Sequence, residues 1–228
     1  MKRMCFSLLL LLASLGLKAQ VFKIDEFKLA ASNGASGIYA DYDCNQHCVF
    51  FVDMQVSESS PRMQVRLDSK VDEFAKALEK TQKKYLEWSK TAKEKGITSV
   101  SKDMTSSFPS LDMFFLDSEH GFWYKVSSKV MRAKFLVSDD GSCYLVLMSG
   151  EVSSNEAVFP HLHSEGNTFV DLVGEWEEPY GPQRDFTLQC PGAAWVFSSA
   201  EEIAMFADKL RKAKEWKTAS VKRGKVLR

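Results

Sequence analysis

The sequence has no excess charge of either sign, and it lacks the short motifs by which many enzymes are recognised. Thirty Lys and Arg residues balance thirty Asp and Glu residues, so the chain offers no general electrostatic field for DNA, RNA or an anionic membrane. It contains no Gly-x-Ser-x-Gly elbow, and no glycine-rich phosphate loop follows a predicted strand. Its four histidines have no fixed acidic partner and give no readable catalytic triad. These absences argue against a nucleic-acid-binding protein and against the common hydrolase families.

A long apolar run is present only at the N-terminus. Lys2 and Arg3 precede a leucine-rich segment at residues 8–12, and the apolar run ends at Ala19. A basic start, about a dozen apolar residues and a small exit residue are typical of a secretory signal peptide. The run is shorter than the ~20 residues that span a bilayer, and no cysteine stands at the cleavage point. We therefore expect residues 1–19 to be removed and the mature protein to be exported, periplasmic or secreted, with no integral membrane segment and no lipoprotein anchor.

Removal of this segment leaves 209 residues, of which 27 are basic and 30 are acidic. This length is within reach of one domain. A hydrophobic content of 45%, with 16 Phe and 5 Trp, is ample for a packed core. We expect a single domain over residues 20–218 and a basic, frayed tail over residues 219–228.

One helix is predicted from residue 69 to about residue 95. Apolar or neutral residues recur there at alternating steps of three and four, which places them on one face of a helix. They are Val71, Phe74, Leu78, Thr81, Tyr85, Trp88 and Ala92. Asp68 or Ser69 is expected to cap the start of the helix, and Gly96 to end it in the left-handed conformation.

A second helix is predicted from about Ala200 to Trp216. Ser199 and Glu202 match a capping box, in which the hydroxyl and the carboxylate each satisfy a free backbone N–H. Its apolar stripe comprises Ile203, Phe206, Leu210 and Ala213.

The remaining pattern is that of strands, with alternating apolar and polar residues or short runs rich in Val and Phe. The predicted strands are 48–56, 63–67, 113–116, 122–126, 131–137, 144–148 and 194–197. These elements predict an α+β protein, with an antiparallel sheet and two amphipathic helices packed on one face.

The two helices also resemble each other in sequence. Phe74–Lys80 aligns with Phe206–Lys212, and Val71 then matches Ile203. A true duplication would make each half a set of strands followed by a helix, a strand-strand-helix repeat. Chance similarity between two amphipathic helices is the alternative.

Two further segments carry a family resemblance. Residues 87–102 read EWSKTAKEKGITSVSK and lead on to Phe108-Pro109, and residues 197–203 read FSSAEEI. With these segments the chain resembles an uncharacterised family of small exported proteins of gut Bacteroidetes, and Lys18-Ala19-Gln20 is similar to signal-peptide exits common in that phylum. The resemblance covers residues 60–212. It implies an origin and a fold type, and it carries over no catalytic residue, because no activity is established for that family.

The mature chain keeps four cysteines, which permit three disulfide pairings in an oxidising compartment. They are Cys44, Cys48, Cys143 and Cys190. An extended chain would hold the Cα atoms of Cys44 and Cys48 about 13 Å apart, too far for a disulfide, so this pair needs a turn at residues 45–47. Free, partly buried thiols are the alternative.

Side chains that bind soft metals gather weakly at two places. Cys44, His47 and Cys48 lie within five residues, and His161 and His163 would project from one face of a strand. A closed zinc site usually needs four ligands. The simpler interpretation places these histidines in a polar turn and an exposed loop, so we expect no metal and no cofactor.

Residues 175–185 combine acids with aromatic rings. Glu175, Trp176, Glu177, Glu178, Tyr180, Arg184 and Asp185 lie there among prolines and glycines that mark a loop. Rigid aromatic side chains on loops are typical contact residues. We expect Trp176, Tyr180 and Arg184, together with Phe159 and His161, to bind a ligand or partner.

The sequence therefore predicts an exported, non-enzymatic protein that binds a protein partner or a small ligand. The alternative is a secreted hydrolase acting on glycans or peptides, with the acids of residues 175–185 at its active site.

Overall fold

The structure of the protein is a computed structural model, and it describes residues 21–32, 34–42, 48–54, 62–117, 122–158 and 187–226. The elements in chain order are β1 (Val21–Lys28), β2 (Ala35–Tyr42), β3 (Cys48–Met54), β4 (Met63–Arg66), α2 (Val71–Lys95), β5 (Val100–Met104), β6 (Ser110–Asp117), β7 (Phe122–Val130), β8 (Arg132–Val137), β9 (Cys143–Met148), β10 (Val152–Ser154), β11 (Ala157–Val158), β12 (Leu188–Cys190), β13 (Ala194–Phe197) and α3 (Ala200–Val226). The predicted strands and both predicted helices are present, and α3 continues ten residues beyond its expected end at Trp216.

Within the described residues the strands form three antiparallel sheets, where the sequence analysis expected one. A seven-stranded sheet has the order β1-β2-β3-β4-β6-β7-β11, and a four-stranded sheet has the order β13-β9-β8-β5. Strands β10 and β12 form a separate pair. The α+β class is confirmed.

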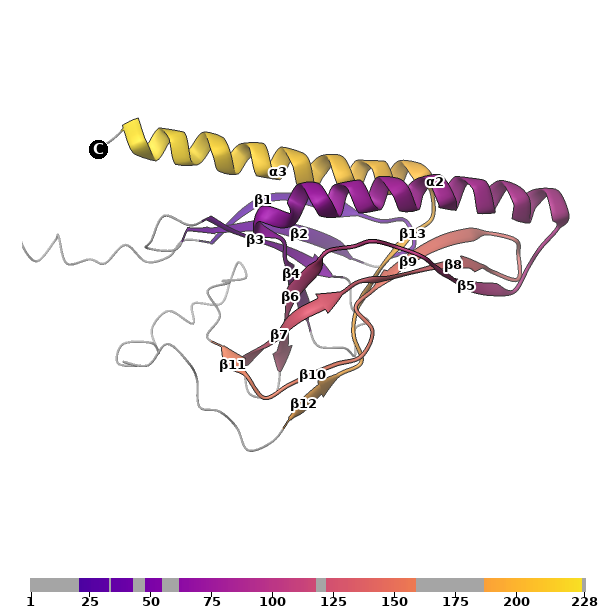
Figure 1. Ribbon diagram of the computed structural model, residues 1–228, viewed down its shortest axis with the longest axis horizontal. Coiled ribbons are helices and arrows are strands. Elements are labelled where there is room, and N and C mark those ends of the chain that lie inside the picture. Colours follow the sequence, from indigo (N-terminus) through magenta and orange to yellow (C-terminus); the bar gives the residue numbers. More distant parts are fainter. Residues whose placement is uncertain are drawn as a thin grey trace, which may run out of the picture.

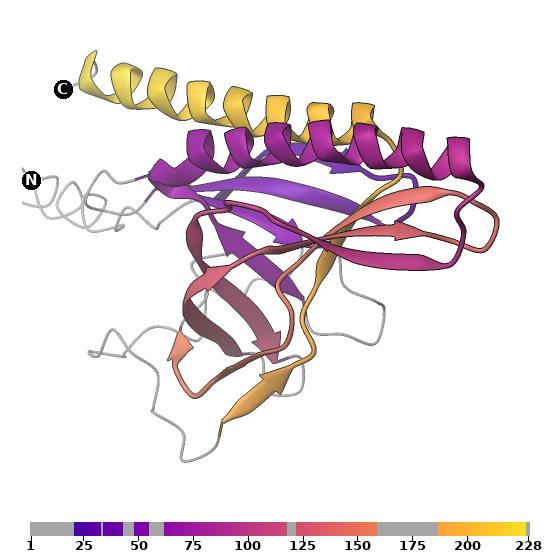
Figure 2. The same ribbon diagram turned by 45° about the vertical axis from the view of Figure 1, so that its right-hand side comes forward.

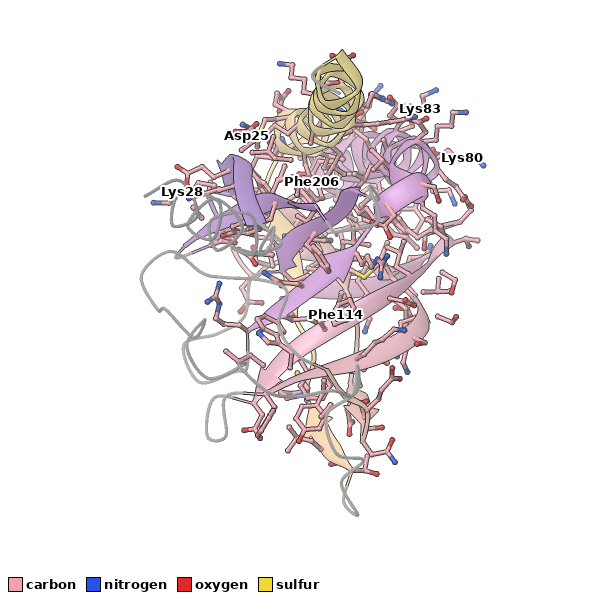
Figure 3. The ribbon with its side chains drawn as sticks, turned by 90° about the vertical axis from the view of Figure 1, so that its left-hand side faces the viewer. Asp25, Lys28, Lys80, Lys83, Phe114 and Phe206 are labelled. Atoms are coloured by element: carbon pink, nitrogen blue, oxygen red, sulfur yellow. The ribbon has the colours of Figure 1, made fainter. Side chains whose placement is uncertain are left out.

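Both helices lie side by side on one side of the sheets (Figures 1 and 2). Gln82 Nε2 of α2 donates a hydrogen bond to the carbonyl oxygen of Ala200 at the start of α3 (2.7 Å). Near the start of α2, Asp72 pairs with Lys214 of α3. The two helices therefore run antiparallel, and the charged side chains of Lys80 and Lys83 project away from the sheets (Figure 3).

The main core lies between the helices and the sheets, and the predicted stripe residues supply it. Phe74, Leu78, Ile203, Phe206 and Leu210 are buried there. Tyr85 is also buried, and Trp88 is partly buried with its ring 5.6 Å from that of Phe135. Residues spaced three and four apart thus face the sheets as the helical pattern predicted.

Each helix packs against strands from the other half of the chain. The ring centroid of Tyr85 in α2 lies 6.0 Å from that of Phe135 in β8. The ring centroid of Phe206 in α3 lies 4.5 Å from that of Phe27 in β1. Figure 1 shows α2 extending over β8 and β5, and α3 extending over β1. The N-terminal and C-terminal halves are interlocked through their helices.

The order of the strands can be compared with the predicted repeat. Four consecutive antiparallel strands, β1 to β4, precede α2, and the four strands β5, β8, β9 and β13 pair in chain order before α3. However, β4 lies inside the seven-stranded sheet, whereas β13 lies at the end of the four-stranded one. The duplication stays a prediction.

The ends of the helices differ in part from expectation. Gly96 ends α2 in the left-handed conformation (φ 60°), as predicted. Asp68 and Ser69 do not cap α2: they lie in a 3-10 turn, and the helix begins after Lys70 with no side-chain cap. The sequence pattern could not distinguish a cap from an extra turn that continues directly into the helix.

The capping box of α3 is half formed. Ser199 Oγ accepts the Glu202 N–H (3.2 Å), as predicted. The Glu202 carboxylate instead accepts the N–H of Ser198 (2.6 Å) and, across the structure, the N–H of Ala30 (2.6 Å). Glu202 thus links the start of α3 to the segment between β1 and β2.

Candidate binding surface

The binding residues predicted from the sequence lie outside the described residues. This applies to Phe159, His161, Trp176, Tyr180 and Arg184. Of the weak metal candidates, Cys44, His47 and His163 also lie outside, and Cys48 is described only as part of the backbone of β3. The structure leaves these predictions untested.

The side chains of two cysteines, Cys143 and Cys190, are described, and both are free. Cys143 and Cys190 are buried thiols, so for these two the alternative of free thiols holds. Burial raises the pKa of Cys190, and the hydrogen bond from the Gly192 N–H offsets this only in part. A thiol held in its neutral form is a poor nucleophile, so Cys190 is suited to packing.

The four-stranded sheet offers a surface that the sequence analysis did not identify. Its strands alternate between a buried face and a partly exposed face. On the helix side, Leu145, Leu147, Trp195 and Phe197 are 0% exposed. Figures 1 and 2 show both helices on that side, and no described helix or strand over the other side. We call this other side the open face.

The open face carries an apolar strip beside a charged margin. The apolar strip consists of Leu136, Tyr144, Val146, Met148, Ala194 and Val196, all partly exposed. The strand register aligns Val146 with Val196 on one side and with Lys134 on the other. These strip residues come from three strands that are neighbours in the sheet, so they form one continuous surface.

The charged margin comes from β8 and β5. Lys134 Nζ lies 3.7 Å from Asp103 Oδ1, a solvent-exposed ion pair. Arg132 lies opposite Met148 and is exposed. Among the described residues it has no ion-pair partner. The margin therefore presents one guanidinium free to bind a carboxylate.

A signal for this surface was present in the sequence. Strand β9 reads CYLVLM, six apolar residues in a row, and β13 reads AWVF. Continuous apolar runs are typical of strands that are covered on both faces, whereas antiparallel strands with one wet face alternate. In the described structure only one face of β9 is covered.

The outer side of the seven-stranded sheet carries aromatic rings as well, but these are buried. Phe51, Phe114 and Trp123 form a cluster separate from the main core and are 5%, 9% and 5% exposed. The rings of Phe51 and Phe114 meet edge to face at 5.7 Å, and Phe114 lies well away from the helix layer (Figure 3). Such small exposed fractions leave little surface for a ligand.

A buried amide lies beside this cluster. Gln64 is 3% exposed and donates from Nε2 to Asp53 Oδ1 (2.7 Å), while its carbonyl oxygen has no hydrogen-bond partner. Asp53 Oδ2 accepts the N–H of Gly37 (3.2 Å). These bonds fix the amide in the sheet, and its oxygen is inaccessible to an external ligand.

No constellation for catalysis appears in the part of the chain that the structure describes. In that part, no three His, Cys, Asp or Glu side chains come together in a way that could hold a metal ion. No helix of the described ranges is long and apolar enough to cross a membrane.

The fold thus defines an α+β protein in which two antiparallel helices cover one side of antiparallel sheets; among the described residues, no element covers the other side of the four-stranded sheet, the open face. Comparison of the chain with protein-family models, with curated proteins and with solved structures finds no match.

Proposed function

We propose that the chain is an exported, non-enzymatic protein that binds another molecule through the open face of its four-stranded sheet. The observation that carries this proposal is strand β9, an unbroken apolar run that the described elements cover on one side only. The six residues of the strip are each partly exposed and adjacent to one another, and contiguous apolar surface on a folded protein marks interaction sites. A bound partner would remove this surface from water, at a gain of roughly 25 cal/mol per Å² of apolar area.

Export is the second part of the proposal. It rests on the basic start, the apolar run and the small exit residue within residues 1–19. A periplasmic or secreted location follows from that interpretation, and the resemblance to exported proteins of gut Bacteroidetes agrees with it.

The hydrolase alternative depends on the acids of residues 175–185, which lie outside the described residues. The geometry described above gives it no support. Binding is the function that the described surface supports best.

Native mass spectrometry of the protein purified from its own host would test the proposal. We expect the wild-type protein to retain the mass of a partner or ligand, and Val146→Asp to lose it, because a carboxylate at the centre of the apolar strip disfavours apolar contact. The control is Leu86→Asp, which changes an apolar residue that is 51% exposed on α2. Circular dichroism melts would show that both variants fold.

Two results would contradict the proposal. One is a wild-type protein that carries no additional mass. The other is equal retention by Val146→Asp and the wild type. If Val146→Asp fails to fold, Val196→Asp, on the neighbouring strand of the same strip, replaces it.

A further inference from the structure

The open face has the dimensions of one helix. Strands lie about 4.8 Å apart, so the two strands β9 and β13 together with the edge of β8 give a strip roughly 10 Å wide. From Tyr144 to Met148 the strip is about 14 Å long. An α-helix is ~10 Å in diameter and rises 1.5 Å per residue, so nine or ten helical residues would cover the strip.

The layer structure favours the same occupant. Apolar sheet faces in proteins are covered by helices or by a second sheet. In the four-stranded sheet one face is already covered by a helix, α2, which contacts β8 through Tyr85 and Trp88. A helix on the open face would complete a three-layer arrangement. An extended peptide would instead need a free strand edge. Of the two edge strands, β5 carries Lys102 and Asp103, charges that disfavour such pairing, and β13 is only 4 residues long.

Charge defines one end of the strip. Arg132 lies opposite Met148, and its Nη2 atom is 2.7 Å from the position that a Cβ atom on Gly150 would occupy. The absence of a side chain at Gly150 therefore leaves room for the guanidinium beside the backbone. The neighbouring cation Lys134 is already paired with Asp103. A carboxylate on the occupant would therefore meet Arg132.

A second copy of this chain does not fit this description. The apolar stripes of α2 and α3 are used in the main core, and the outward positions are mostly charged along α2 and along α3 as far as Glu215, where the description of its side chains ends. Leu86 is a single exposed apolar residue on α2 and forms no stripe. The described helices of another copy have no second apolar face to offer.

We propose that the open face binds an amphipathic helix of a partner protein, with its apolar stripe on the strip and an acidic residue on Arg132. This inference rests on the proposed binding function and adds the chemistry of the partner. Helix recognition of this kind is read through side chains at positions i, i+3, i+4 and i+7 of the bound helix.

Site-specific photo-crosslinking in the host tests the inference. The full-length chain would carry p-benzoyl-phenylalanine in place of Val146, with the same substitution at Leu86 as the matched control. We expect an adduct from position 146 and none from position 86. Mass spectrometry would identify the crosslinked segment, which would then be synthesised as a peptide.

The peptide provides the second measurement. We expect it to gain helical circular dichroism on binding and to lose at least tenfold in affinity for Arg132→Glu. Replacing the acidic residue of the peptide by lysine should restore binding to that variant, because the swap recreates the ion pair. Because Arg132 is exposed, its substitution should leave the fold intact.

The outcomes separate the two proposals. No adduct from position 146 overturns both the binding function and its helical partner. An adduct whose peptide binds without becoming helical, or binds Arg132→Glu as well as it binds the wild type, keeps the binding function and overturns the helix. An adduct with a second copy of this chain also overturns the inference.

Discussion

The two faces of the four-stranded sheet share the same backbone and differ in how far their side chains are covered by other elements. On the helix side, Phe135 is buried and its ring contacts those of Tyr85 and Trp88. One residue further along β8, Leu136 points to the open face and is partly exposed. Both residues are apolar, so composition alone does not distinguish them. We therefore expect the free energy of unfolding to depend mainly on the side chains of the helix side. Stability does not explain why the residues of the open face are apolar.

The largest expected effect separates these two neighbours. Phe135→Ala should lower the free energy of unfolding by about 3–5 kcal/mol, because it removes a buried ring and leaves a cavity beneath α2. Leu136→Ala should lower it by only about 0.5–1 kcal/mol, since its side chain is already partly in water. Urea unfolding of both variants followed by circular dichroism would measure the difference.

Equal losses for the two variants would break the comparison. They would mean that the open face is packed as tightly as the helix side in the free protein. A small loss for Phe135→Ala would show instead that α2 contributes little to folding. Protection of the β9 backbone amides against hydrogen exchange, which reports local stability, should then be low.

A smaller effect is expected at the hydroxyl that joins α2 to the strands. Tyr85 Oη lies 3.0 Å from the carbonyl oxygens of Cys143 and Ser198, and donates its hydrogen to this pair of acceptors. Tyr85→Phe keeps the ring and removes the hydroxyl, so we expect a loss of about 1–2 kcal/mol in the free energy of unfolding. The urea midpoint should fall with little change in its slope.

The pH dependence provides a control for this variant. Burial raises the pKa of Tyr85. A folded pKa above the unfolded one gives stability that is present below the unfolded value, near 10, and lost as pH rises further. The wild type should therefore lose part of its advantage over Tyr85→Phe above pH 10. An advantage that grows above pH 10 would be inconsistent with a buried hydroxyl.

Much of the fold follows from local patterns in the sequence. The stripe from Phe74 to Ala92 predicts which side of α2 is buried, because the helical period alone determines which residues share a face. The alternation in β8 likewise predicts that Ala133, Phe135 and Val137 are buried. These features need no knowledge of the partner elements.

The pairing of the strands required more than local pattern. Strands β6 and β7 interrupt the second set of strands between β5 and β8, and they join the first sheet next to β4. Such long-range choices depend on which faces meet, and one sequence does not record this. For the same reason the sequence did not predict that each helix packs against strands from the other half of the chain.

The candidate surface shows the same limit. Residues 144–148 were predicted as a strand, and the unbroken apolar character of the observed strand Cys143–Met148 is visible in the sequence. Whether such a run has one covered face or two depends on the layers around it. Residues 175–185 were predicted to bind a ligand or partner because of their aromatic and acidic composition, but they lie outside the described part of the chain.

The smallest expected effect concerns an ion pair between α3 and β1, the end strand of the seven-stranded sheet. Lys209 Nζ of α3 lies 2.8 and 2.7 Å from the two carboxylate oxygens of Asp25 in β1. Partial burial acts to raise the pKa of Asp25, but the hydrogen bond and charge of Lys209 and the Glu26 N–H outweigh it, so the pKa is lowered. A lowered folded pKa gives stability that is present above the unfolded value of 3.8 and lost as pH falls through the folded value. Because 35% of the Asp25 side chain is exposed, solvent screening limits this contribution to no more than about 1 kcal/mol.

Lys209→Met keeps the apolar stem of the side chain and removes its charge, so it isolates the ion pair. The variant should be less stable than the wild type at pH 7, and the difference should shrink towards zero as pH falls from 3.8 through the lowered folded pKa of Asp25, below which Asp25 is protonated in both proteins. Urea unfolding at several pH values would measure this difference, and added salt should reduce it at pH 7 because the pair is partly exposed. A difference that stays constant from pH 7 to pH 2 would show that Lys209 stabilises α3 through packing of its stem. Apolar contact would then hold α3 to the sheets even beside β1, which would sharpen the contrast with the charged margin of the open face.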